Sequence, residues 1–165
     1  FCIRMKSIPL KPFIWFLAFA AITVVSCTKN RLYDETFTIP GGKWNLKHPA
    51  FFEVSIADTN QPQNVFLSIR NAPDYPFSNL YLFMHTHYPD GKISKDTLEL
   101  TLADYDGRWL GKGMGSVKFS LFLLKKNVHF SKPGLYRFEF IQAMRMNDLN
   151  GITDIGFRIE NPEKE

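Results

Sequence analysis

The segment Leu135–Met144 reads Leu-Tyr-Arg-Phe-Glu-Phe-Ile-Gln-Ala-Met and carries the strongest secondary-structure signal in the chain. Its rings Tyr136, Phe138 and Phe140 recur at every second position, with charged residues between them. Successive side chains of a β-strand point to opposite faces, so this period places the three rings on one face. The segment therefore predicts a half-buried strand whose aromatic face covers a core.

The same period of two recurs along most of the chain after residue 35. Turn-forming residues separate the repeats, and no segment shows a helical period over ten or more residues. The expected strands cover residues 36–39, 51–57, 64–70, 80–86, 97–102, 117–130, 135–144 and 152–159. This pattern predicts an all-β chain folded as a two-sheet antiparallel β-sandwich of about eight or nine strands, with a jelly roll as one form of that architecture.

Three segments carry more specific expectations. Residues 80–86 begin apolar on both faces, which is typical of a central strand. The strand expected over residues 117–130 has one face made of Val117, Phe119, Leu121 and Leu123. Asp148–Gly151 indicates a one-turn helix or a tight turn, because its residues are typical turn formers.

The first residues have the pattern of a lipoprotein signal peptide. Two lysines precede the apolar run Phe13–Val25, whose 13 residues are too few to cross the ~30 Å hydrocarbon core of a bilayer as a helix. The run ends in Val-Val-Ser-Cys27, which resembles a lipobox, whose cysteine receives a diacylglycerol before cleavage and a further acyl chain after it. The alternative is an ordinary secreted protein that has a cysteine at its cleavage site.

The chain therefore divides into a signal peptide (1–26), a lipid-anchored tether (27–34) and a β-sandwich domain (35–165). Residues 1–4 precede Met5, and a start at Met5 and an earlier start both remain open. The aspartate that retains such lipoproteins in the inner membrane does not follow Cys27, since Thr28 comes next. We therefore expect an outer-membrane protein that faces the periplasm.

Cleavage removes most of the positive charge. The chain of 165 residues has a net charge of +4, but Arg4, Lys6 and Lys11 all lie in the signal peptide. The remaining 17 basic and 16 acidic residues give +1, which removes the argument for binding nucleic acid. Cys2 is lost with the signal peptide and Cys27 is the lipid attachment residue, so no disulfide is expected.

No motif predicts catalysis. The chain has no Gly-x-Ser-x-Gly nucleophile elbow, and the glycines of residues 111–115 lack the order of a phosphate-binding loop. His85 and His87 share one face of a strand and could hold a metal if a third ligand converged, but a solvated pair is the simpler interpretation. Asp104 and Asp106 are more typical of a turn than of a catalytic pair. We expect no enzyme activity, no cofactor, no metal and no small-molecule substrate.

Two aromatic loops are the candidate partner-binding sites. The residues concerned are Tyr75, Phe77, Arg108 and Trp109, because aromatic rings and arginines are common in binding hot spots. The alternative is that these rings cap the ends of the sandwich core. We further expect Arg70 and Arg145 to be paired rather than free.

Several motifs follow one another in the order of a known family. They include Cys27, Tyr33-Asp34-Glu35, Ile69-Arg70-Asn71, Tyr75-Pro76-Phe77-Ser78-Asn79-Leu80, Gly107-Arg108-Trp109-Leu110-Gly111-Lys112-Gly113, Gln142-Ala143-Met144-Arg145 and Gly151-Ile152. Together they resemble the GldH-type gliding-motility lipoproteins over nearly the whole mature chain. The resemblance implies an outer-membrane lipoprotein whose partners belong to the gliding motility, secretion or cell-envelope machinery. Only Cys27 takes a defined role from it, as the lipid attachment point.

A second function remains open at this stage. A β-sandwich with exposed aromatic rings can bind the sugar rings of an envelope glycan, as a carbohydrate-binding module does. This alternative requires the ring of Trp44 or Trp109 to be exposed. A hydrolase is a third and weaker candidate.

Overall fold

A computed structural model describes residues 31–113 and 115–162 of the chain. The signal peptide and Cys27 lie outside these residues. The elements are β1 (Arg31–Thr38), a 3-10 turn η1 (Pro40–Gly42), β2 (Lys43–Asn45), β3 (Ala50–Ile56), β4 (Gln63–Asn71), β5 (Asn79–His87), β6 (Ile93–Thr101), β7 (Lys118–Val128), β8 (Gly134–Gln142), β9 (Asp148–Asn150) and β10 (Ile152–Glu160). Among the described residues, no helix has the length and hydropathy needed to cross a membrane.

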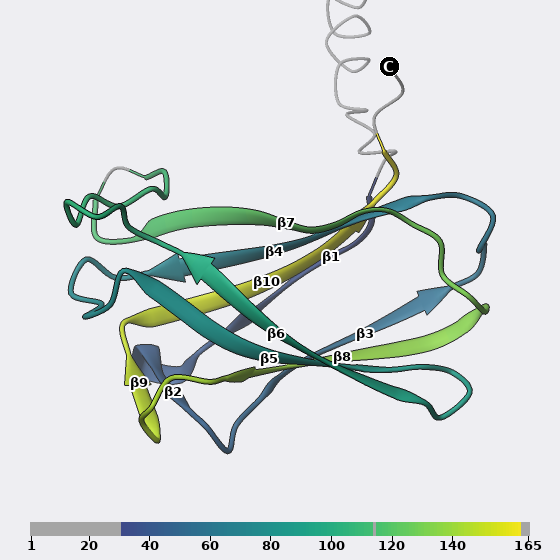
Figure 1. The fold of residues 1–165 in the computed structure, drawn as a ribbon, viewed down its shortest axis with the longest axis horizontal. Helices are drawn as coiled ribbons and strands as arrows, with labels where there is room; N and C mark the ends of the chain where they lie inside the picture. The colour runs from purple at the N-terminus through teal and green to yellow at the C-terminus, as the bar shows by residue number, and fades with distance from the viewer. Residues whose placement is uncertain (1–30, 114, 163–165) are drawn as a thin grey trace, which may run out of the picture.

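The strands form two stacked four-stranded sheets and one small two-stranded sheet (Figure 1). One large sheet has the order β1-β10-β4-β7 and the other β3-β8-β5-β6, while β2 pairs with β9. Every pair is antiparallel. The chain thus folds like one long hairpin, in which β5 pairs with β6, β4 with β7, β3 with β8 and β1 with β10. This nested order is that of a jelly roll, so the predicted antiparallel sandwich is confirmed.

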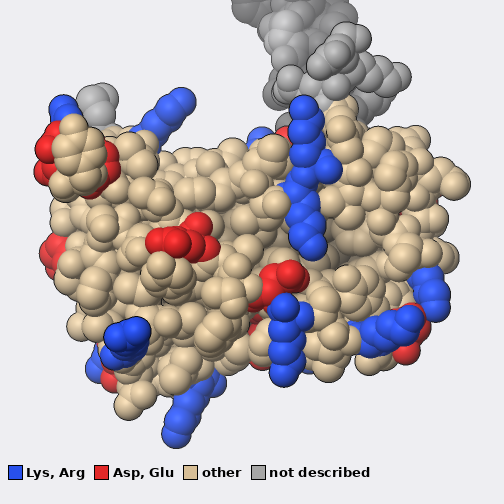
Figure 2. Space-filling view, viewed as in Figure 1, with Lys and Arg blue, Asp and Glu red and all other residues tan. Residues whose placement is uncertain are grey.

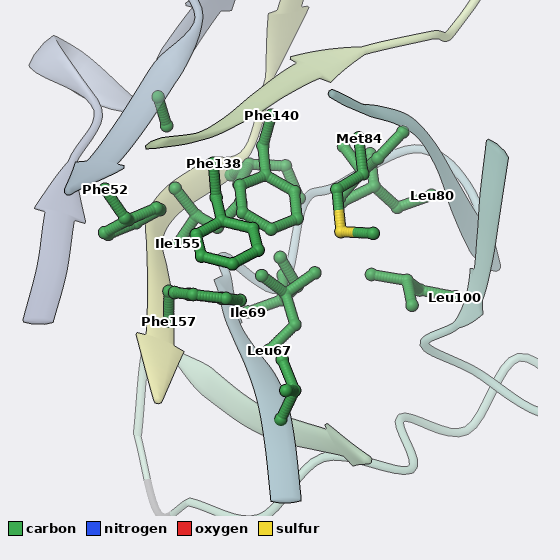
Figure 3. Close-up of a cluster of buried hydrophobic side chains, with 14 of the residues drawn as sticks. Phe52, Leu67, Ile69, Leu80, Met84, Leu100, Phe138, Phe140, Ile155 and Phe157 are labelled. Carbon is green, nitrogen blue, oxygen red and sulfur yellow. The ribbon is translucent and has the colours of Figure 1, made fainter. Parts of the chain in front are cut away.

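Aromatic rings from both sheets fill the space between them. Along β8 the inward residues Tyr136, Phe138 and Phe140 are all buried, as the alternation of the sequence predicts. Figure 3 shows Phe138 and Phe140 pointing towards Phe157 on the opposite sheet. The ring centroids of Phe138 and Phe157 lie 4.5 Å apart. Burial of such rings, at about 1.5–3 kcal/mol for each side chain, is the main force that holds the two sheets together.

The first strand begins earlier than the sequence indicates. Residues 31–34, assigned above to the tether, belong to β1 and pair with the end of β10. The physical reason is Tyr33, whose ring packs edge-on against the core rings of Phe52 and Phe157. The sandwich domain therefore includes Arg31–Asp34.

One other segment differs from expectation, and in another the structure shows which of two apolar faces is inside. Asp148–Asn150 is neither a helix nor a turn but the strand β9, because buried Leu149 pairs with buried Trp44 of β2. In β7, the face that carries Leu121 and Leu123 points to solvent, while Phe122 packs against the core. The expected central position of residues 80–86 is confirmed, since β5 lies between β8 and β6.

The sandwich has two distinct ends. We call the end where β1 begins and β10 finishes the tether end, since Arg31 pairs there with Glu160. The opposite end, where Thr38 pairs with Asp154, carries the β4–β5 and β6–β7 connections, and we call it the loop end (Figure 1). The length of β1 separates the two by about 25 Å, at roughly 3.3 Å per residue.

Candidate functional site

Tyr75 anchors the β4–β5 loop at the loop end. The loop is fixed to the β9–β10 turn, because the Ala72 N–H donates to the Gly151 carbonyl at 2.8 Å. The Tyr75 ring is buried, and its hydroxyl donates to the Asn79 carbonyl at 2.8 Å. Burial raises the pKa of this hydroxyl, so it stays protonated and keeps donating. Tyr75 therefore supports the loop rather than offering a contact surface.

Asp104 organises the neighbouring β6–β7 loop. One of its carboxylate oxygens accepts the N–H groups of Asp106 at 3.0 Å and of Arg108 at 2.8 Å. The Arg108 guanidinium also reaches both acids, at 3.2 Å from Asp104 and 2.9 Å from Asp106. These contacts match the turn role expected for the two aspartates. Arg108 is exposed, but it is already paired within its own loop.

Of the four predicted partner-binding residues, the two loops bring together the three aromatic ones. The Tyr75 ring lies 5.7 Å from that of Phe77 and 6.4 Å from that of Trp109, measured between centroids. Phe77 and Trp109 are half-buried and pack against the core. The rings therefore cap the core, and those of Phe77 and Trp109 also reach the surface.

Beside Phe77 lies an apolar groove that the sequence does not reveal. It is lined by Phe77, Tyr81, Ala143, Met144, Arg145 and Met146, has a volume of about 590 Å³, and is called the Met144 groove below. One wall of the groove is supported by Gln142, which is fully buried. Its side-chain N–H donates to the Met146 carbonyl at 2.8 Å, and its side-chain oxygen accepts from the Met144 N–H at 3.0 Å. The other wall is held at β5, where the Ala143 N–H donates to the Tyr81 carbonyl at 2.8 Å. Hydrogen bonds therefore tie the loop residues of the groove to β5 and to the end of β8.

The groove carries one free positive charge. Arg145 is exposed and forms no ion pair with any of the residues described, so the expectation that it is paired is wrong. Arg70, by contrast, lies over the Phe119 ring at 6.0 Å. At the edge of the groove the Glu99 carboxylate raises the pKa of the Tyr81 hydroxyl. The groove thus combines an apolar floor of aromatic and methionine side chains with an unpaired guanidinium.

Two further exposed residues at the loop end were not predicted. Tyr105 stands at the tip of the turn held by Asp104 and is 97% exposed, and Leu110 on the same loop is 58% exposed. The sequence contains a signal for Tyr105, namely a ring between two turn-forming aspartates. No comparable signal marks the groove, because its residues come from the β4–β5 loop, the start of β5 and the β8–β9 connection.

One of the two tryptophans that a carbohydrate-binding module would need to expose is buried. Trp44 is only 1% exposed, and its indole N–H donates to the His48 carbonyl at 3.0 Å. It therefore cannot stack on a sugar. Trp109 is half-buried against Tyr75, which leaves only part of its ring accessible.

The two strand histidines form a polar network on the outer face of their sheet. Nδ1 of His85 lies 2.9 Å and Nε2 of His87 lies 3.6 Å from the same oxygen of Glu139. Residues 31–113 and 115–162 contain no group of three or more such side chains placed to hold a metal ion.

Comparison with known proteins identifies relatives along almost the entire chain. The family model described as GldH lipoprotein matches residues 31–159. The chain is 39% identical over 157 residues to a protein of Christiangramia forsetii named "Gliding motility lipoprotein GldH homolog", with 91% of this chain and 96% of the relative covered. It is 35% identical over 154 residues to "Gliding motility lipoprotein GldH" of Flavobacterium johnsoniae, with 89% and 95% covered. No solved structure matches the chain. The chain belongs to the GldH lipoprotein family.

Proposed function

We propose that the chain is a non-enzymatic lipoprotein, anchored through Cys27 to the periplasmic face of the outer membrane, that binds another protein of the gliding motility or associated secretion machinery. Both relatives have gliding motility in their names. The sequence around Cys27 supports the anchor. Two acyl chains already hold a protein stably on a bilayer, and a lipobox cysteine carries three.

The observation that carries the binding role is the Met144 groove and its position. Methionine and aromatic side chains form adaptable apolar contact surfaces, and the free Arg145 adds a charge that an acidic residue of a partner can pair with. The groove lies at the loop end, about 25 Å from the tether end along β1. A partner can therefore reach it while the domain stays on the membrane.

Replacing Cys27 with serine is expected to release the protein from membranes. A serine hydroxyl is not a substrate for the thiol alkylation, so no acyl chain is added. The measurement is the distribution of the protein between the membrane and soluble fractions of cells, with the acylated N-terminal peptide checked by mass spectrometry. If the serine variant stays in the membrane fraction, Cys27 is not the anchor.

A second substitution tests the groove. Met144→Glu places a carboxylate on the apolar floor and is expected to lower capture of the partner at least tenfold, which corresponds to about 1.4 kcal/mol. The measurement is a pull-down from detergent-solubilised membranes, with the captured proteins quantified by mass spectrometry. Colony spreading in a strain lacking the wild-type protein gives a second readout.

Leu123→Glu is the matched control, because Leu123 is an exposed leucine on the opposite sheet and away from the groove. It adds the same charge and should leave capture and spreading unchanged. Equal capture by the wild type and both variants would show that the groove is not the contact surface.

A further inference from the structure

A cavity of about 200 Å³ opens at the tether end, opposite the Met144 groove. Both sheets contribute to it, and its lining includes Met84, Tyr88, Leu124, Val128, Phe130 and Tyr136. Lys125, His129 and Ser131 also line it and are exposed, so they lie at its mouth. The cavity is therefore apolar inside and polar at its entrance, and we call it the tether-end cavity.

Irregularities in β7 shape this cavity. The pairing of β4 with β7 shifts register twice, between Gln63 and Val65 and again between Val65 and Phe66. Asn127 takes a left-handed backbone with φ of 55°, and its N–H is held by the Asn64 side chain at 3.0 Å.

In a regular strand only every second residue would face the interior. Because of these bulges, the neighbours Leu124 and Lys125 both line the cavity, as do Val128 and His129. Bulges that redirect side chains are common beside functional sites.

The cavity lies close to the expected lipid anchor. Across the sheet, Arg31 of β1 pairs with Glu160 of β10, and Glu160 pairs with Asn64 of β4. Gln63, next to Asn64, pairs with Val128 of β7. Val128 therefore lies three strand spacings from Arg31, or about 14 Å. Cys27 precedes Arg31 by only four residues, which span at most about 14 Å. A domain held so closely presents its tether end to the bilayer. This step rests on the anchoring proposed above.

We infer that the tether-end cavity binds the end of an acyl chain of an anionic lipid, and that Lys125 and His129 at its mouth attract the anionic head group. An apolar cavity of about 150 Å³ takes up benzene, so 200 Å³ has room for about eight chain carbons.

A chain that moves from the bilayer into the cavity stays in apolar surroundings, so the head group decides the binding. The Lys125 ammonium favours a phosphate or a carboxylate over a neutral head. The ligand is thus an anionic phospholipid of the bilayer or a free fatty acid.

Photolabelling of the mature lipidated protein in phosphatidylcholine vesicles tests this site. Three probes carry a diazirine at the end of an acyl chain: a phosphatidylglycerol, a phosphatidylcholine and a fatty acid. We expect labelled peptides from residues 84–88 and 124–138, with the phosphatidylglycerol probe about fivefold more efficient than the phosphatidylcholine probe, as one lysine contact predicts. Labelling by the fatty acid as well identifies a free acid as a ligand, and labelling by phosphatidylglycerol alone identifies a bilayer lipid.

Variants make the result specific. Val128→Trp fills the cavity and should abolish labelling of these peptides, while Leu123→Trp, on the exposed face of the same strand, should not. Lys125→Gln, at an exposed position, should lower labelling by phosphatidylglycerol to the level of phosphatidylcholine. Labelling outside these peptides only, or labelling that neither Val128→Trp nor Lys125→Gln changes, would overturn the inference.

Flotation of the vesicles separates this inference from the proposed anchoring. Protein that does not float with the vesicles contradicts the anchor. The fatty acid probe still tests the cavity in that case, because it reaches the protein from solution.

Discussion

Replacing Phe157 with alanine is expected to lower the free energy of unfolding by about 3–5 kcal/mol. Phe157 is fully buried at the middle of β10, the strand that pairs with both β1 and β4. Its ring centroid lies between 4.5 and 6.2 Å from those of four other rings, Tyr33, Phe52, Phe138 and Phe140. Phe52, Phe138 and Phe140 belong to strands of the opposite sheet and Tyr33 to the edge strand β1, so the truncation opens a cavity where the layers join. Urea unfolding of the mature protein, followed by tryptophan fluorescence, measures the loss.

Phe83→Ala is the matched control for this experiment. It removes the same side chain, but Phe83 is 43% exposed on the outer face of β5. We expect it to cost less than about 1 kcal/mol, because partly exposed rings lose less burial and leave no closed cavity. Similar losses for the two variants would contradict a central role for the Phe157 ring cluster.

The strands could be predicted where one face is apolar and the other polar. In β3, Phe52, Val54 and Ile56 alternate with mostly polar neighbours, and all three are buried as expected. In such a segment the period of two also shows which face is buried, since a shift by one residue would expose the whole apolar set. The nested pairing of the strands follows from the jelly-roll architecture rather than from any local pattern.

The prediction is incomplete in β7, because both of its faces are apolar. Leu121 and Leu123 alternate with Phe122 and Leu124, so the period does not say which pair is inside. The two bulges then change the alternation along the strand. Strand β9 was missed for a different reason, since three residues are too few to show a period and its partner Trp44 is about a hundred residues away.

The residue types of the sequence indicate which loop residues lie near one another, but not how they are arranged. Tyr75, Phe77 and Trp109 do meet, as loop aromatics in a sandwich often do. Their exposure depends on the β9–β10 turn, which lies far from them in the sequence and covers Tyr75. The Met144 groove depends on the register of β5 against β8, and a single sequence contains no signal for that register.

The charged surface agrees with the corrected charge of the mature chain. On the face shown in Figure 2, basic and acidic side chains are interspersed and separated by wide uncharged areas. This face offers no continuous basic surface of the kind that tracks a phosphate backbone.

Gly151→Ala is expected to lower the free energy of unfolding by about 2–4 kcal/mol and also to weaken partner capture. Gly151 has φ of +91°, and an added Cβ would lie 2.9 Å from the Tyr75 Cα. Because the nearest atom belongs to the backbone, the Tyr75 loop must move. The Gly151 carbonyl also accepts the Ala72 N–H, so the movement passes to Phe77 in the groove. Urea unfolding measures the stability, and the pull-down used for Met144→Glu measures the capture.

Gly91→Ala separates the backbone strain from the contact with the loop. Gly91 also has a positive φ, +82°, but an added Cβ would meet nothing within 4 Å. It lies in the β5–β6 turn, away from the groove, so we expect a loss of about 1 kcal/mol from strain alone and unchanged capture. The excess loss for Gly151→Ala then measures the packing of the β9–β10 turn against Tyr75. If the Gly151 variant loses stability but captures the partner as the wild type does, the contact surface does not depend on the Tyr75 loop.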